Sequence, residues 1–189
     1  MNSVIPMKVK MDASTVKQAS PKSLIKIGTW WEYELIRKGQ LIDKWENGNV
    51  TTDEGLDFML DVMFHGETAV ATWYIGIFES NTTPLVTHTY AVPGFTECSA
   101  YAEAARVAFV EAAASGKSIT NSANKATFTI NDTKTIYGAA LFGGGTGPTV
   151  ISNTAGGGVL FASSKFALSK SVVATDVLLV TCTITLADV

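Results

Sequence analysis

The stretch from Val177 to Leu186 alternates between two sets of side chains with a period of two residues. One set is wholly apolar, and the other ends in three threonines. The members of the apolar set are Leu178, Val180, Cys182, Ile184 and Leu186. Successive side chains of a β-strand point to opposite faces, so this pattern predicts a strand with its apolar side against a core. The threonine side is expected to face mostly outward.

Upstream runs of aromatic and β-branched residues, separated by turn signals, predict further strands. They cover residues 29–37, 41–46, 71–79, 127–130, 135–142 and 159–169. Asn131 and Asp132 separate two of these runs and predict a hairpin. The glycine-rich stretches 143–148 and 156–158 predict breaks. Residues 101–113 stay open between helix and strand, because their alanines favour a helix and 106–110 favours a strand.

Residues 51–64 predict one short helix. Thr51 and Glu54 have capping-box spacing, in which each side chain accepts a hydrogen bond from a free backbone N–H of the first turn. An apolar stripe recurs at helical spacing and comprises Leu56, Met59, Leu60 and Met63. Gly66 is expected to end the helix, and the stripe is expected to lie against a sheet. Short strands with one helix predict a mainly β fold: an antiparallel β-sandwich, jelly-roll-like, in one domain spanning 29–189.

Residues 1–28 are polar, contain two prolines and show no clear period, which predicts an N-terminal arm. Five lysines and one aspartate give the arm a charge of about +4. Since the net charge of the whole chain is −3, the rest of the chain carries about −7. These lysines are Lys8, Lys10, Lys17, Lys22 and Lys26. Dispersed lysines without arginines or interleaved aromatics make a poor nucleic-acid site. The two open interpretations are a solvated terminus and an arm that contacts an acidic neighbour.

The chain is poor in charge, with 16% charged residues against a typical share of about 25%. Hydrophobic residues make up 47%, which favours apolar surface that partners cover. No apolar stretch approaches the ~20 residues of a membrane span, and residues 1–10 lack the apolar core of a signal peptide. Cys98 and Cys182 have no metal-ligand spacing, so we expect two reduced thiols.

Residue patterns that carry chemistry are weak in this sequence. Neither His65 nor His88 has an acidic or cysteine partner at ligand spacing. The sequence Gly-Lys-Ser at 116–118 imitates the end of a phosphate loop, but Glu111 stands where the loop needs a glycine, so a turn is expected. Asp57 and Asp61 share a helix face and could hold Mg²⁺, although a solvated face is the simpler reading. We therefore expect no catalytic residue, no metal and no cofactor, and a protein that is not an enzyme.

Trp30 and Trp31 are adjacent within the first predicted strand. Neighbouring residues of a strand face opposite sides, so they cannot both point into one core. One of them must be covered by the helix, the arm or another subunit, and we favour the arm or a subunit. With the five arm lysines, these two tryptophans are the candidate partner interface.

The order of several short motifs resembles a family of small virion proteins of tailed bacteriophages. The resemblance covers roughly residues 29–189. Its main blocks are the helical stretch 50–62 (VTTDEGLDFMLDV) and the strand 72–78 (TWYIGIF). Shorter blocks are 95–97, Tyr101, 106–109, 121–123, 126–128 and 136–139. The resemblance implies a non-enzymatic virion component, often encoded with head genes, with 73–78 as a buried strand.

The function expected from this resemblance is a capsid decoration, or cement, protein. Such a protein would bind the major capsid protein or other virion subunits, with a homotrimer favoured, and without nucleic acid or membrane as partner. A tail baseplate, adaptor or fibre-attachment protein is an alternative, because it uses the same β architecture. A third possibility is a carbohydrate-binding fibre module, which exposed Trp31 or Trp73 would favour.

Overall fold

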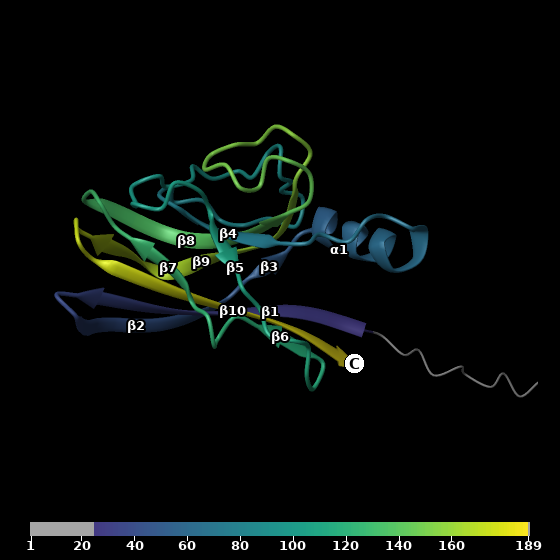
Figure 1. Ribbon diagram of the computed structural model, residues 1–189, viewed down its shortest axis with the longest axis horizontal. Helices are drawn as coiled ribbons and strands as arrows, with labels where there is room; N and C mark the ends of the chain where they lie inside the picture. Colours follow the sequence, from purple (N-terminus) through teal and green to yellow (C-terminus); the bar gives the residue numbers. More distant parts are fainter. Residues whose placement is uncertain (1–24, 189) are drawn as a thin grey trace, which may run out of the picture.

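The computed structural model describes residues 25–188, which form two antiparallel β-sheets packed face to face (Figure 1). The first sheet has the order β2–β1–β10–β6, and β7 also pairs with β10. Its strands are β1 (Ile25–Arg37), β2 (Gln40–Gly48), β6 (Ser118–Thr120), β7 (Ala126–Thr129) and β10 (Val177–Asp188). The second sheet has the order β3–β9–β8–β4–β5. Its strands are β3 (Val50–Thr51), β4 (Trp73–Phe78), β5 (Val107–Phe109), β8 (Lys134–Gly143) and β9 (Val159–Val172). The expected mainly antiparallel β fold is confirmed.

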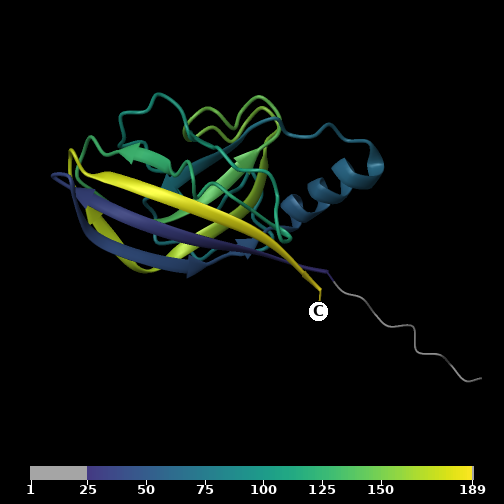
Figure 2. The same ribbon diagram turned by 60° about the horizontal axis from the view of Figure 1, so that its bottom comes forward.

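Strands β1 and β10 form the spine of the first sheet and run side by side over their whole length (Figure 2). Their pairing extends from Ile25 opposite Asp188 to Ile36 opposite Val177. Residues 25–28 therefore belong to β1, whereas the sequence had placed them in the arm. Gly28 does not interrupt the pairing, since it lies opposite Thr185 within the ladder. The arm predicted over residues 1–24 lies outside the described residues.

The predicted hairpin between residues 127–130 and 135–142 is wrong. Strand β7 pairs with β10 in the first sheet, whereas β8 pairs with β4 and β9 in the second. The chain crosses between the sheets at Ile130, whose backbone N–H donates to the carbonyl of Asp176. The ambiguous stretch 101–113 is mostly loop and contributes only the three residues of β5 to a sheet.

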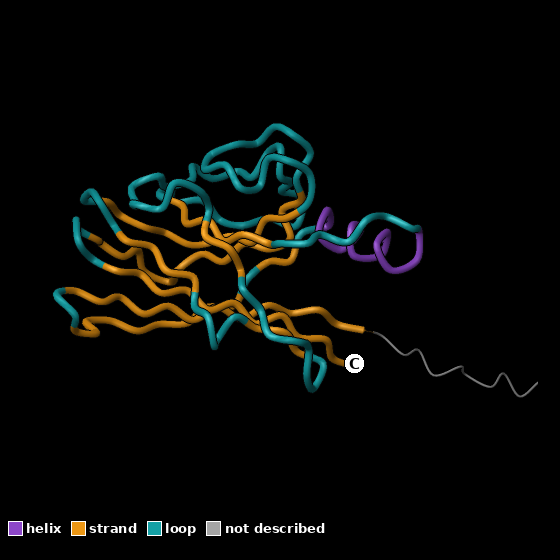
Figure 3. The backbone as a smooth tube through the Cα atoms, viewed as in Figure 1, coloured by secondary structure: helices purple, strands orange, loops and turns teal. Residues whose placement is uncertain are grey.

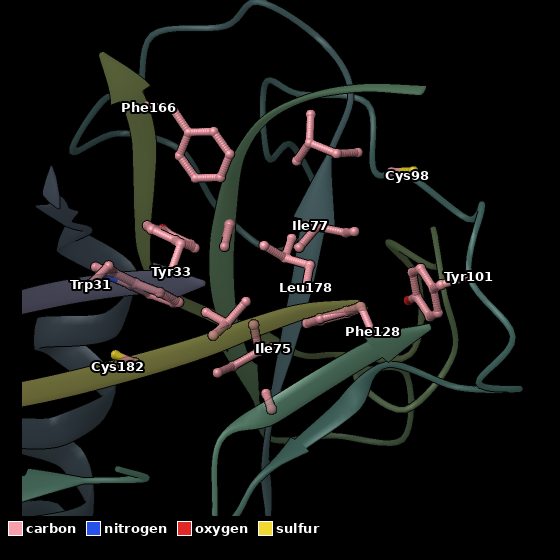
Figure 4. Close-up of a cluster of buried hydrophobic side chains, with 14 of the residues drawn as sticks. Trp31, Tyr33, Ile75, Ile77, Cys98, Tyr101, Phe128, Phe166, Leu178 and Cys182 are labelled. Carbon is pink, nitrogen blue, oxygen red and sulfur yellow. The ribbon is translucent and has the colours of Figure 1, made fainter. Parts of the chain in front are cut away.

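The core lies between the two sheets and is built from the inward faces of their central strands (Figure 4). The second sheet contributes Ile75 and Ile77, both fully buried. The apolar face of β10 is buried at Leu178, Val180 and Cys182, as the alternation predicted. It emerges toward the C-terminal end, where Ile184 is half-buried and Leu186 is 40% exposed. The strand therefore extends beyond the sheet that covers it.

The helix α1 (Asp53–Leu60) contacts the sandwich as far as Phe58, which packs edge-on against Trp73, and the helical chain beyond projects from the body (Figure 3). Its N-cap is Thr52, not Thr51: the Thr52 hydroxyl accepts from the Gly55 N–H at 3.0 Å. Glu54 does not close a capping box, because its carboxylate accepts from the backbone N–H groups of Tyr90 and Leu160, each at 2.7 Å. The Thr52 and Glu54 contacts attach the helix start to β9 and to the loop containing Tyr90.

Beyond Leu60 the helix continues as a π-helical turn, η1 (Asp61–His65), and ends at Gly66 in a left-handed conformation. The expected end at Gly66 is confirmed. The expected packing of the whole apolar stripe on a sheet is wrong. Leu56 and Met59 are half-buried, but the outer members Leu60 and Met63 are exposed.

Candidate interaction surfaces

Three of the seven residues predicted for a partner interface lie in the described part of the chain. Lys26 is exposed near the start of β1. Trp31 is fully buried in the core, where its ring stacks near Tyr33 and its indole N–H donates to the Thr29 hydroxyl at 3.2 Å. Trp31 thus cannot reach a partner in this fold, and its assignment to the interface is corrected. Lys8, Lys10, Lys17 and Lys22 lie outside the described residues.

Trp30 points to the opposite side of the strand and is 46% exposed, as the alternation required. On the outer face of the first sheet it lies opposite Thr183 of β10 and Gly48 of β2. The small Gly48 leaves room for the indole: a Cβ at that position would lie 3.9 Å from the Trp30 ring. Trp30 therefore forms an aromatic platform on an otherwise polar, threonine-rich sheet face.

The projecting end of the helix is the most exposed apolar feature among residues 25–188. Leu60 is 49% exposed, Met63 63% and Phe64 78%. Phe58 and Met59 of the second turn still contact the sandwich, whereas these three side chains lie farther out and stay exposed. Large apolar side chains grouped at an exposed tip are typical of a surface that binds another molecule.

An apolar groove opens at the same end of the molecule, between the two sheets. Its volume is about 350 Å³. Its walls come from the first sheet, the second sheet and the helix, and include Ile27, Ile119, Ile184, Leu186, Trp73, Phe109, Phe161 and Met59. The groove exists because β1, β10 and β6 extend past the edge of the second sheet. The emergent side chains of β10, Ile184 and Leu186, therefore line it instead of lying in a closed core.

On the other side of the molecule, two long loops cover the outer face of the second sheet, and a buried ion pair within the loop before β5 also bonds to the loop between β8 and β9. The Arg106 guanidinium donates to the Glu97 carboxylate at 2.7 and 2.8 Å, and both side chains are almost fully buried. Arg106 also donates to the carbonyls of Pro148 and Asn153, and Glu97 accepts from the Ser152 N–H at 2.8 Å. These bonds hold the loop before β5 to the loop between β8 and β9.

This ion pair has the burial that functional carboxylates often show, but its groups are already occupied. Hydrogen bonding and charge from Glu97 raise the pKa of Arg106 above its ordinary value, although burial acts in the opposite direction. Both partners bond to each other and to loop backbone, and the Arg106 guanidinium lies 4.0 Å over the Phe142 ring. The arrangement fixes a surface and leaves neither group free for a substrate.

The other residues singled out by the sequence are dispersed. Asp57 and Asp61 lie on the exposed face of the helix, and His65 is exposed at its end. The turn expected at 116–118 is confirmed, since Gly116 and Lys117 both adopt left-handed conformations before β6. Among residues 25–188, no three His, Cys, Asp or Glu side chains gather closely enough to hold a metal ion. No helix in that range is long and apolar enough to cross a membrane.

Cys98 and Cys182 are both free and buried, so no disulfide joins them. Burial raises the pKa of the Cys98 thiol to about 11. Burial also raises the pKa of Cys182, which lies at the centre of β10. Both thiols are therefore protonated near neutral pH and are poor nucleophiles.

Sequence reasoning missed the groove and the exposed helix end. The available signal for the groove was that the apolar alternation of β10 continues to Leu186, although β4 and β5 of the second sheet have only 6 and 3 residues. Comparison of the sequence with known protein families and with curated proteins found no match.

Proposed function

We propose that this protein is a structural component of a tailed-bacteriophage particle, and most simply a capsid decoration protein that stabilises the head through contacts between subunits. The observation that carries the proposal is the uncovered apolar tip of the helix formed by Leu60, Met63 and Phe64. The order of motifs in residues 29–189 resembles that of small virion proteins. A jelly-roll-like topology and a homotrimer belong to the same proposal.

The physical basis is the combination of a stiff body with apolar contact points. The loops over the second sheet are held by the Glu97–Arg106 pair, so the body can transmit load without rearranging. The apolar surface of the helix tip is removed from water only if another subunit covers it. Such burial stabilises the contact by about 25 cal/mol per Å² of apolar surface. Many copies on a shell would each add a modest interface, and their sum would oppose the opening of the shell.

Copy number in purified particles tests the proposal. Quantitative mass spectrometry of particles of the phage that encodes the chain should find hundreds of copies relative to the major capsid protein. Absence of the protein from particles would refute any virion role. About three to twelve copies would favour the alternative, a tail baseplate, adaptor or fibre-attachment protein.

A carbohydrate-binding role has a specific observation in its favour, although not the expected one. Trp31 is buried, and Trp73 is half-buried against Phe161, so neither offers a sugar platform. Trp30 is the exposed candidate, since its indole is 46% exposed on the outer face of the first sheet. Loss of glycan-array binding in Trp30→Ala would support this second function. A wild-type protein that binds no glycan would exclude it.

A further inference from the structure

We propose that the apolar groove at the open end of the sandwich receives residues 5–11 of a second copy of this chain. The inference deepens the proposed structural function, on which it rests, by naming the surface and the segment that join subunits. The groove is lined by β1, β6 and β10 on one side, and by β5, β9 and the helix on the other. It is open to solvent where β10 carries Leu186.

The sequence of residues 5–11 matches such a groove. Although residues 1–28 as a whole show no clear period, the seven residues Ile-Pro-Met-Lys-Val-Lys-Met alternate between an apolar set and a second set. The apolar set is Ile5, Met7, Val9 and Met11, and the other set contains Pro6, Lys8 and Lys10. The segment therefore offers apolar side chains to an apolar groove and lysines to a carboxylate at its rim.

The groove matches this segment in both shape and charge. Its volume of about 350 Å³ exceeds the ~30 Å³ of one water by an order of magnitude, so it has room for several side chains. Its charged lining residues are Glu111 and Lys117. Lys117 already pairs with Asp188 at 2.6 Å, whereas Glu111 has no ion-pair partner within residues 25–188. An entering segment with Lys8 and Lys10 on its outer face would supply the missing cation for Glu111.

The length of the connection allows the segment to reach a neighbour. Residues 12–24 separate it from Ile25, and thirteen residues span at most about 45 Å. Ile27 lines the groove, so the chain leaves the described body beside the groove mouth. At that point β1 runs outward, away from the body (Figure 2).

Because the donated segment and the receiving groove are different surfaces, two copies can exchange segments reciprocally, or several copies can donate head-to-tail. Repetition of such a contact closes into a ring when the rotation between copies allows it. Each copy then donates one segment and accepts one. In this arrangement the apolar groove of each copy is covered and the arm lysines gain an acidic partner, without any additional protein.

Two full-length variants separate donation from acceptance. Ala114 is exposed and lines the groove, so Ala114→Trp should block acceptance without disturbing the core. Val9→Asp places a charge on the apolar face of the segment and should block donation. The matched controls are Ala113→Trp, which is exposed and does not line the groove, and Ser14→Asp, which adds the same charge to the connector.

Analytical ultracentrifugation of the purified proteins should show that the wild type and both controls self-associate. Each blocking variant alone should be monomeric, with a dissociation constant raised by ~10-fold or more. An equimolar mixture of Ala114→Trp and Val9→Asp should form a heterodimer, because one retains its segment and the other its groove. That heterodimer would not depend on a virion role, so its formation without particle incorporation would refute the proposed function and leave this inference standing.

Three results would overturn the inference. A monomeric wild type at the highest soluble concentration would show that no copy donates its segment to another. Association that persists in Ala114→Trp but not in Val9→Asp would place the segment elsewhere. A mixture of the two variants that stays monomeric would show that they do not complement each other.

Discussion

Replacement of Arg106 by leucine should remove the link between the two loops that cover the second sheet. The guanidinium donates to Glu97, to the carbonyls of Pro148 and Asn153, and at 3.4 Å to the Tyr90 hydroxyl. In Arg106→Leu, the Glu97 carboxylate stays in the interior and keeps only the N–H of Ser152 as a partner among these groups. An unpaired buried carboxylate is costly, because water is not there to replace the lost donors.

The expected loss is about 3–5 kcal/mol in the free energy of unfolding, since removing one partner of a buried ion pair leaves the other charge uncompensated. The double variant Glu97→Leu/Arg106→Leu should lose less than the sum of the two single variants, because it leaves no isolated charge. Lys117→Gln serves as a control, because it breaks an ion pair whose side chains are both more than 60% exposed. It should cost below about 1 kcal/mol.

Urea unfolding followed by tryptophan fluorescence measures the wild type, Arg106→Leu, Glu97→Leu, the double variant and Lys117→Gln. The slope with urea should stay constant across the set, which would show that only stability has changed. A loss below 1 kcal/mol for Arg106→Leu would refute the argument that this pair holds the loops. So would equal losses in Arg106→Leu and Lys117→Gln.

Three further predictions concern the core, the pH dependence and the thiols. Leu178→Ala should lower the free energy of unfolding by about 2–5 kcal/mol, because Leu178 is buried. Leu186→Ala should lower it by well under half as much, because Leu186 is 40% exposed on the same strand. Equal losses in urea unfolding would contradict the burial described. The hydrogen bonds from Arg37 lower the pKa of Asp176 below 3.8, so its contribution is complete above that pH and is lost as pH falls through the lowered pKa. The difference in the free energy of unfolding between the wild type and Asp176→Asn should therefore become smaller only in acid. A difference that grows in acid would contradict the lowered pKa of Asp176. Iodoacetamide at pH 8 should label Cys98 only after unfolding, because its pKa is about 11, and rapid labelling of the folded protein would disprove its burial.

Several elements of the fold could be predicted from local pattern. The period-two alternation identified β10, and the break between the predicted runs 29–37 and 41–46 separated β1 from β2, where Lys38 and Gly39 adopt left-handed conformations. The pairing of strands could not be predicted in the same way. The composition of residues 130–134 suits a hairpin turn and a crossover to the other sheet equally well, so it does not distinguish between them. The contact that decides between them is the distant bond from Ile130 to Asp176.

The candidate surfaces were predictable only in part. Alternation showed that Trp30 and Trp31 face opposite sides, but two identical residues give no sign of which one is buried. The N-cap was ambiguous for the same reason, because Thr51 and Thr52 are equally good caps, and only contact with Phe161 selects Thr52. The groove depends on how far one sheet extends past the other, which is a tertiary property.

Electron microscopy of the intact phage particle tests the central claim most directly. A map at side-chain resolution should show this sandwich repeated over the head surface, with the helix tip at Leu60, Met63 and Phe64 covered by a neighbouring subunit. A head and tail fully accounted for by other proteins, with no density for this fold, would contradict the claim.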